Sequence, residues 1–193
     1  DVEPDTGNID VSKLERLITL RTKAVVSNDM WGHPCDKDVI LAICRKYDLL
    51  YIEDCSHAHF SEYKGKYSGT FGDIACWSFQ SLKFLSGGEG GILLTDNFAF
   101  YERAVLLGHY SWRSLQTAAT PGFTELGASG FGLKLRMHPL AAVMADQEGV
   151  DEGFFVFEAL YPEPFAGYFV GVEAEGRIFL LEECRMVGEL GLP

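Results

Sequence analysis

Short apolar runs that end in a polar residue alternate with an amphipathic stretch in the first part of the chain. KAVVSN (23–28) and LLYIED (49–54) have the β-branched and aromatic composition of strands, and KDVILAICRKY (37–47) between them has apolar residues along one helical face. Strand, helix, strand alternation with nearly continuous apolar strands is typical of a parallel sheet covered by helices. The sequence therefore predicts an α/β fold with a mostly parallel sheet.

The alternation of strand and helix patterns continues to about residue 148. DIACWS (73–78) and GILLTD (91–96) predict two further strands. Helical spacing of apolar residues predicts three more helices, over 11–18 with Asp10 or Ser12 as its cap, over 97–110 and over 138–148. Residues 111–130 are rich in Thr, Ser, Gly and Ala, which favours a long loop.

Beyond residue 148 the composition changes. Residues 149–193 form an acidic tail rich in aromatic residues, with an apparent β-hairpin about EAEGR (173–177). We therefore expect one domain over 1–148 and an unassigned tail over 149–193.

The formal charge of −12 argues against a nucleic acid or an anionic membrane as partner, because both are bound by clustered Lys and Arg. The sequence contains no apolar run of the roughly 20 residues that a membrane span needs, and its first residues do not resemble a signal peptide. We expect a cytoplasmic protein. The five cysteines lack CxxC spacing and the histidines lack HExxH spacing, so we expect reduced core thiols and no metal site.

Polar residues stand where two of the predicted strands end. Asp54 closes LLYIED and Ser78 closes DIACWS. Because ligands gather at the carboxyl ends of parallel strands, we expect both residues at one ligand-binding edge of the sheet. A helix N-cap is an equally good reading of Asp54, and Ser78 is also compatible with capping a turn.

Lys83 lies in SFQSLKFLSGGEGG (78–91), a segment with an apolar first half and four glycines in its second half. Partial burial would favour a deprotonated amine, as a covalent catalyst requires, but a surface lysine at a strand end is the alternative. The nucleotide loop GxxxxGK[ST] and the dinucleotide fingerprint GxGxxG are both absent. The glycines are expected to let the backbone turn sharply and approach a flat ligand closely.

Three separated blocks together resemble the DegT/DnrJ/StrS sugar aminotransferases, pyridoxal-phosphate enzymes of the aspartate aminotransferase superfamily (fold type I). They are WGHPCD (31–36), the block IEDCSHAHFSEYKGKYSGTFGDIACWSFQSLKFLSGGEGGILLTDN (52–97) and GFGLKLRMHPLAA (130–142). Their order and spacing match over residues 1–148. The resemblance implies that these residues are part of the large, cofactor-binding domain of such an enzyme.

The resemblance also implies roles for individual residues. Asp54 would bind the pyridine nitrogen, where a carboxylate keeps the ring protonated as an electron sink, and His57 would contact the ring. Ser78 would bind the phosphate, and Lys83 would form the Schiff base and move protons during catalysis. In the last block Lys134 stands where a residue approaches the cofactor of a neighbouring subunit. His59 and Arg136 are the expected substrate-binding residues.

The implied reaction is transamination of a keto-sugar or cyclitol ketone, with glutamine or glutamate as the amino donor, in a homodimer. A related branch dehydrates sugars and has histidine in place of the lysine, so Lys83 favours transamination. Family members are longer, and we expect the chain to be a fragment of such an enzyme. Phe60 and Ser61 replace a glycine and alanine pair of the family. A non-catalytic remnant or binding protein of the same fold is the alternative.

Overall fold

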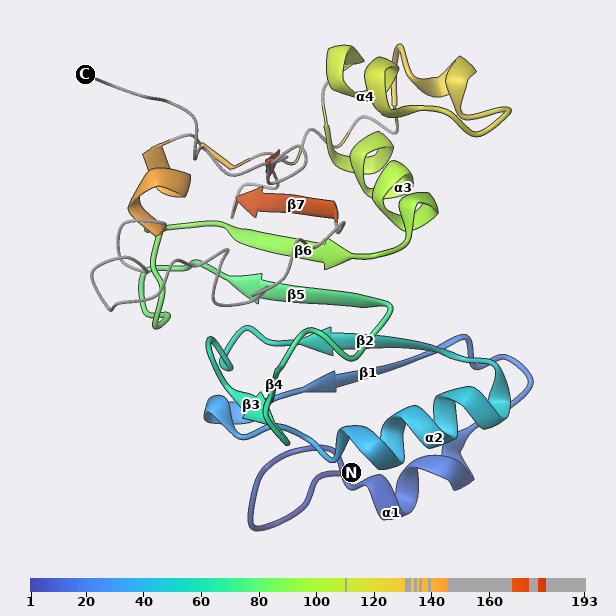
Figure 1. Cartoon of the computed structure of the whole chain (residues 1–193), viewed down its shortest axis with the longest axis vertical. Coiled ribbons are helices and arrows are strands. Elements are labelled where there is room, and N and C mark those ends of the chain that lie inside the picture. The colour runs from blue at the N-terminus through green and yellow to red at the C-terminus, as the bar shows by residue number, and fades with distance from the viewer. Residues whose placement is uncertain are drawn as a thin grey trace.

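The computed structural model describes residues 1–109, 111–130, 133, 135, 137–138, 140–145, 168–173 and 177–179. Within these residues the main feature is a six-stranded sheet in the order β1-β2-β5-β6-β7-β8 (Figure 1). Its strands are β1 (Ala24–Asn28), β2 (Leu50–Asp54), β5 (Ile74–Ser78), β6 (Gly91–Thr95), β7 (Tyr168–Glu173) and β8 (Arg177–Phe179). A separate hairpin consists of β3 (Glu62–Tyr63) and β4 (Lys66–Tyr67).

The strands β1, β2 and β5 are parallel, which confirms the predicted α/β class. The register pairs Asn28 with Asp54 and Asp54 with Cys76. The connection between β1 and β2 contains the helix α2 (Lys37–Tyr47), which begins and ends where the sequence predicted. The carboxyl ends of these three strands therefore lie at one edge of the sheet, on the left of Figure 1.

The remaining strands are antiparallel. Ser78 at the end of β5 pairs with Gly91 at the start of β6, and β7 and β8 continue the antiparallel order. A parallel connection needs a crossover of roughly a dozen residues or more, usually a helix, and residues 79–90, all of which the structure describes, contain no helix. This connection, which contains no helix, turns β6 back beside β5 and places Lys83 at the edge where β5 ends. Residues 174–176, in the middle of the predicted hairpin, lie outside the described residues.

Helices pack on both halves of the strand order. Besides α2, the described helices are α1 (Val11–Leu14), which continues as the 3-10 turn η1 (Glu15–Leu17), α3 (Phe98–Gly108) and α4 (Ser111–Thr117), with further 3-10 turns η2 (Met30–Gly32) and η3 (Thr124–Leu126). The cap of α1 is Asp10, whose carboxylate accepts from the Ser12 N–H. α2 packs on β1 and β2, whereas α3 packs on β6 and β7 (Figure 1). Residues 140–145 are also helical. In the described part of the chain, every helix is too short or too polar to span a lipid bilayer.

The prediction of a loop over 111–130 is wrong in its first third, where α4 forms. Ser114 and Thr117 are buried on the face of α4 that meets α3. The buried carboxylate of Glu102 accepts hydrogen bonds from the backbone N–H groups of Ala119 and Thr120, at 2.5 and 2.7 Å. Small polar residues favour loops in isolation, but here tertiary packing against α3 determines the local structure.

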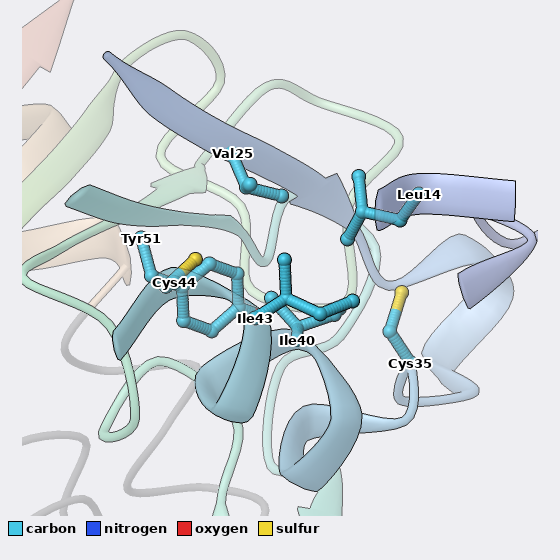
Figure 2. Close-up of a cluster of buried hydrophobic side chains, with 7 residues drawn as sticks. All are labelled: Leu14, Val25, Cys35, Ile40, Ile43, Cys44 and Tyr51. Carbon is cyan, nitrogen blue, oxygen red and sulfur yellow. The ribbon is translucent and has the colours of Figure 1, made fainter. Parts of the chain in front are cut away.

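A compact hydrophobic cluster supports the parallel half of the sheet (Figure 2). Side chains from α1, β1, β2, α2 and the loop before α2 meet there: Leu14, Val25, Cys35, Ile40, Ile43, Cys44 and Tyr51. Among the described residues, all cysteines are free, and those at positions 35, 44 and 55 are buried. The expectation of reduced core thiols is confirmed for these residues.

Candidate active site

Asp54 ends β2 at the edge where the parallel strands terminate. Its Oδ2 accepts a hydrogen bond from Asn28 Nδ2 at 2.7 Å, and its Oδ1 accepts from the Ser56 N–H at 3.0 Å. Burial acts to raise the pKa of Asp54, but the hydrogen bonds from Ser56 and Asn28, together with the nearby His57, lower it below its usual value. Asp54 is therefore a half-buried carboxylate that stays ionised near neutral pH.

Ser78 and His59 are joined at the same edge. The imidazole Nε2 of His59 lies 2.9 Å from the carbonyl oxygen of Ser78. Because a carbonyl only accepts, Nε2 donates, and the neutral ring keeps Nδ1 as an acceptor. The pKa of His59 is lowered to about 4, chiefly by burial and also by the charges of Lys83 and His57, against the opposing effect of the Ser78 bond. His59 is therefore neutral at pH 7.

Lys83 lies in the loop 79–90, which we call the Lys83 loop. Its backbone N–H donates to the carbonyl of Gln80 at 2.8 Å, and its side chain is half-buried. Within the described residues, its ammonium group has no hydrogen bond or salt bridge. The flanking Leu82 and Phe84 are 90% and 62% exposed, so an amine without a bound partner stands in a largely apolar surface segment.

The glycines of the Lys83 loop allow its sharp turn and its close packing. Gly88 and Gly90 have φ values of +81° and +133°, which confirms the expected sharp turn. A Cβ on Gly87 would lie 2.6 Å from the Ala141 carbonyl oxygen, and one on Gly90 would lie 3.1 Å from Met137 Cε. The close approach expected toward a flat ligand is therefore made to the protein's own segment around 137–141.

A buried network of charged side chains lies beside the ends of β1 and β2. Lys37 Nζ is 2.6 Å from Asp29 Oδ2 and 2.8 Å from Glu53 Oε2, and all three side chains are at most 1% exposed. Burial acts to lower the pKa of Lys37, but Glu53, Tyr51 and Asp29 raise it, so the lysine remains charged. Cys55 lies beside the two carboxylates in an arrangement that suits a metal ion, but the Lys37 ammonium already forms ion pairs with both carboxylates.

The network also fixes the loop that follows β4. Glu53 accepts hydrogen bonds from the backbone N–H groups of Gly69, Phe71 and Gly72, at 3.0, 2.8 and 2.6 Å. Gly69 has a φ of +91°, and a Cβ there would lie 2.1 Å from the Trp77 ring. The carboxylate and the glycine together hold this loop against the end of the sheet.

Sequence reasoning missed two parts of the site. Asn28 ends β1 as Asp54 ends β2, so the rule that polar residues at strand ends share an edge would have found it. Nothing in the local sequence pairs Lys37 with Asp29 and Glu53, because Lys37 lies in an amphipathic helix where a lysine normally faces solvent.

The structure brings together five of the residues expected at the site. Asp54, His57, His59, Ser78 and Lys83 are connected by the hydrogen bonds and electrostatic contacts described above. The other two expected residues, Lys134 and Arg136, lie outside the described residues.

Phe60 has a backbone conformation that glycine normally adopts. Its φ is +59°, in the left-handed region that costs an L-residue about 1 kcal/mol. The ring packs edge-on against Phe84 of the Lys83 loop, with centroids 5.9 Å apart. Phe60 therefore has a glycine-like conformation at a position where the family that the chain resembles has glycine.

Comparisons with known proteins show which proteins this chain resembles in sequence and fold. A putative L-glutamine:3-amino-2,3-dideoxy-scyllo-inosose aminotransferase from Micromonospora echinospora is 39% identical over 122 residues, which cover 63% of this chain and 29% of that protein. The crystal structure of an aminotransferase from Psychrobacter cryohalolentis is similar with a TM-score of 0.62 and 34% identity over 75% of this chain and 38% of that one. The chain thus matches less than a third of the length of the first curated relatives.

A third similarity concerns the cofactor. GDP-4-keto-6-deoxy-D-mannose-3-dehydratase from Escherichia coli, solved with bound hydrated pyridoxal phosphate, is similar with a TM-score of 0.56 and 26% identity over 62% of this chain and 30% of that one. The expected cofactor is therefore confirmed as the one that this group of proteins binds. The family model of the DegT/DnrJ/EryC1/StrS aminotransferases matches residues 1–148, and the chain belongs to this family.

Proposed function

We propose that the chain is part of a pyridoxal-phosphate-dependent aminotransferase that aminates the ketone of a sugar or cyclitol, with glutamine or glutamate as amino donor. The observation that carries the proposal is that an ionised Asp54 and the Lys83 amine lie at one edge of the sheet in a chain of this family, and that this amine has no hydrogen bond or salt bridge among the described residues.

The chemistry of the side chains fits the cofactor. Asp54 is held as a carboxylate, the form that can accept a hydrogen bond from a protonated ring nitrogen. Ser78 Oγ accepts from the Gln80 N–H at 3.2 Å, so the hydroxyl proton is available to a phosphate oxygen. Asp54, His57, Ser78 and Lys83 would therefore hold the ring, the phosphate and the aldehyde, and we assign Lys134 to the same site.

Pyridoxal phosphate, when bound, supplies an electron sink that stabilises negative charge at the substrate carbon. The protein's own contribution is positioning and proton transfer. Lys83 would bind the cofactor aldehyde covalently and, once displaced by the amino substrate, hold and return the proton at that carbon. Neutral His59 presents Nδ1 as an acceptor near Lys83, which suits a substrate hydroxyl, and Arg136 is the second proposed substrate-binding residue.

The choice of substrate class rests on two relatives. The Micromonospora protein is named for a cyclitol ketone and glutamine, and the E. coli protein for a keto-sugar nucleotide. Lys83 favours amination over dehydration, because a lysine amine can both bind the aldehyde and transfer the proton. We propose further that the active unit is a homodimer, with Lys134 near the partner's site.

Covalent trapping tests the proposal directly. Incubation with pyridoxal phosphate followed by borohydride reduction should add one cofactor mass to the peptide containing Lys83. The Lys83→Ala variant should lose this label, while Lys64→Ala, which removes an exposed lysine, should keep it. No label at Lys83 at saturating cofactor would favour the non-catalytic alternative.

Two further assays refine the proposal. Cyclitol ketones and nucleotide-linked keto-sugars, each offered with glutamine and with glutamate, should identify the acceptor and donor classes by amine formation. A deoxygenated keto product without amine would instead indicate a dehydratase. Light scattering at high concentration should give the mass of a dimer, and a monomer would contradict the assembly.

A further inference from the structure

Asn28, the last residue of β1, hydrogen-bonds Asp54 through its side chain. Its Nδ2 donates to Asp54 Oδ2 at 2.7 Å. Its Oδ1 is buried and accepts no hydrogen bond in the part of the chain that the structure describes. The reverse orientation of the amide would place two oxygens against each other, so the bond to Asp54 determines how the amide is oriented.

We propose that Asn28 is a positioning residue for the cofactor: its amide fixes the orientation of the Asp54 carboxylate that would meet the ring nitrogen. The inference rests on the proposed function, since it assigns Asn28 a part in that site. Asn28 acts through Asp54 and needs no contact with the cofactor itself.

The surrounding hydrogen bonds explain how the orientation is set. Ser56 N–H holds one carboxylate oxygen at 3.0 Å, and Asn28 holds the other. The backbones are also fixed to each other, because the Asp29 N–H donates to the Asp54 carbonyl at 3.1 Å. Lys37 holds the side chain of Asp29 in turn. Removing the Asn28 amide therefore frees one carboxylate oxygen while the strand stays in place.

The buried Asn28 Oδ1, which has no donor among the described residues, makes it possible to distinguish this role from a purely structural one. A buried acceptor without a donor destabilises the folded state. Leucine has the same branched shape as asparagine and would remove the orphaned oxygen together with the donor. Fold stability and cofactor affinity are therefore expected to respond differently to Asn28→Leu.

Other titratable groups surround Asp54 and bear on any pH experiment. His57 lowers the pKa of Asp54, and its charge is removed in a His57→Gln background. Burial raises the pKa of Cys55 and of Cys76, the latter to about 11, so neither thiol titrates in acid. The other charged groups on the adjoining elements form the buried network: Asp29, Lys37 and Glu53.

A double-mutant cycle on the full chain tests the proposal. Equilibrium dialysis would give the dissociation constant of pyridoxal phosphate for the native protein, Asn28→Leu, Asp54→Asn and the double variant. We expect Asn28→Leu to weaken binding about tenfold, because a bond to a charged group is lost, and to add nothing in the Asp54→Asn background. Asn97→Leu, which removes the cap of α3 at the opposite edge, controls for a general loss of stability.

A second measurement needs no cofactor. NMR titration of the Asp54 carboxyl carbon should show its pKa higher by about one pH unit in Asn28→Leu, and higher still in Asn28→Asp, where two carboxylates meet. An unchanged Asp54 pKa, or a full tenfold loss in the Asp54→Asn background, would overturn the proposal. If the native protein does not bind pyridoxal phosphate, the proposed function fails, and the NMR titration alone decides whether Asn28 controls Asp54.

Discussion

The two halves of the candidate site are built differently. On the Asp54 side, the ends of β1 and β2 rest on three fully buried charges, Lys37, Asp29 and Glu53. The Lys83 loop is instead held by a few backbone hydrogen bonds and by the buried Phe79 and Leu85 at its two sides, and it leaves Leu82 and Phe84 beside the lysine largely exposed. The carboxylate is thus held in place before any ligand arrives, while the amine is carried by a loop.

This difference matches the two chemical tasks. A group that only holds a ring nitrogen benefits from a fixed position. A lysine that binds an aldehyde, leaves it and then moves a proton has to change position during turnover. The following variants test whether rigidity is confined to the Asp54 side.

Loss of the buried Lys37 ammonium should lower the stability of the fold more than the other changes proposed below. Lys37→Met leaves Asp29 and Glu53 as uncompensated buried charges, and we expect about 3–5 kcal/mol less unfolding free energy in urea denaturation. Lys64→Met is the matched control, since it removes an exposed pair with Asp38 and should leave the unfolding free energy nearly unchanged. Equal losses would show that the buried network does not stabilise the Asp54 side.

Substitution of Gly69 should cause the next largest loss of stability. In Gly69→Ala the new Cβ meets the Trp77 ring at 2.1 Å and the backbone has a φ of +91°, so we expect a loss of about 3 kcal/mol. Gly65→Ala has a φ of +77° but nothing within 4 Å of the Cβ, and should cost only about 1 kcal/mol. Thermal melts of both variants separate the steric clash from the backbone strain, and equal melting temperatures would contradict the clash.

His59 connects the two halves and should make stability depend on pH. Its pKa is about 4 when folded, against 6.5 for the free side chain. The unfolded chain therefore binds more protons between these values, and stability falls as the pH drops from about 6.5 to about 4, by on the order of 3 kcal/mol. Chemical denaturation at several pH values should show a flatter profile for His59→Gln than for the native protein. Parallel profiles would mean that His59 is not buried in the neutral form.

Substitutions of Phe60, which contacts the Lys83 loop, should differ least in stability. Phe60→Gly and Phe60→Ala both lose the ring contact with Phe84, but only glycine relieves the positive φ. We expect the glycine variant to be more stable than the alanine variant by about 1 kcal/mol in denaturant titrations. A more stable alanine variant would show that the backbone at this position is not strained.

The sequence predicted the local elements well where apolar periodicity was strong. The helix α2 and the strands β1, β2 and β5 lie where the pattern placed them, because a buried strand or an amphipathic helix needs that pattern to bury its face. The helix α4 was missed because Ser114 and Thr117 favour loops unless a neighbouring element buries them. β6 is antiparallel to β5 because the connection 79–90 contains no helix that would carry a parallel crossover, and the strand pattern alone does not show this.

The alternation of strands and helices and the polar residues at the strand ends come from the sequence itself, since Asp54 and Ser78 follow apolar runs that parallel pairing must align. Tertiary structure alone decided that Lys37 is buried between Asp29 and Glu53, that the glycines after Lys83 pack against Met137 and Ala141, and that Asn28 holds Asp54. Periodicity encodes which face of an element is buried. The partner of a buried charge depends on which distant groups share its low-dielectric surroundings, and only the folded chain brings those groups together.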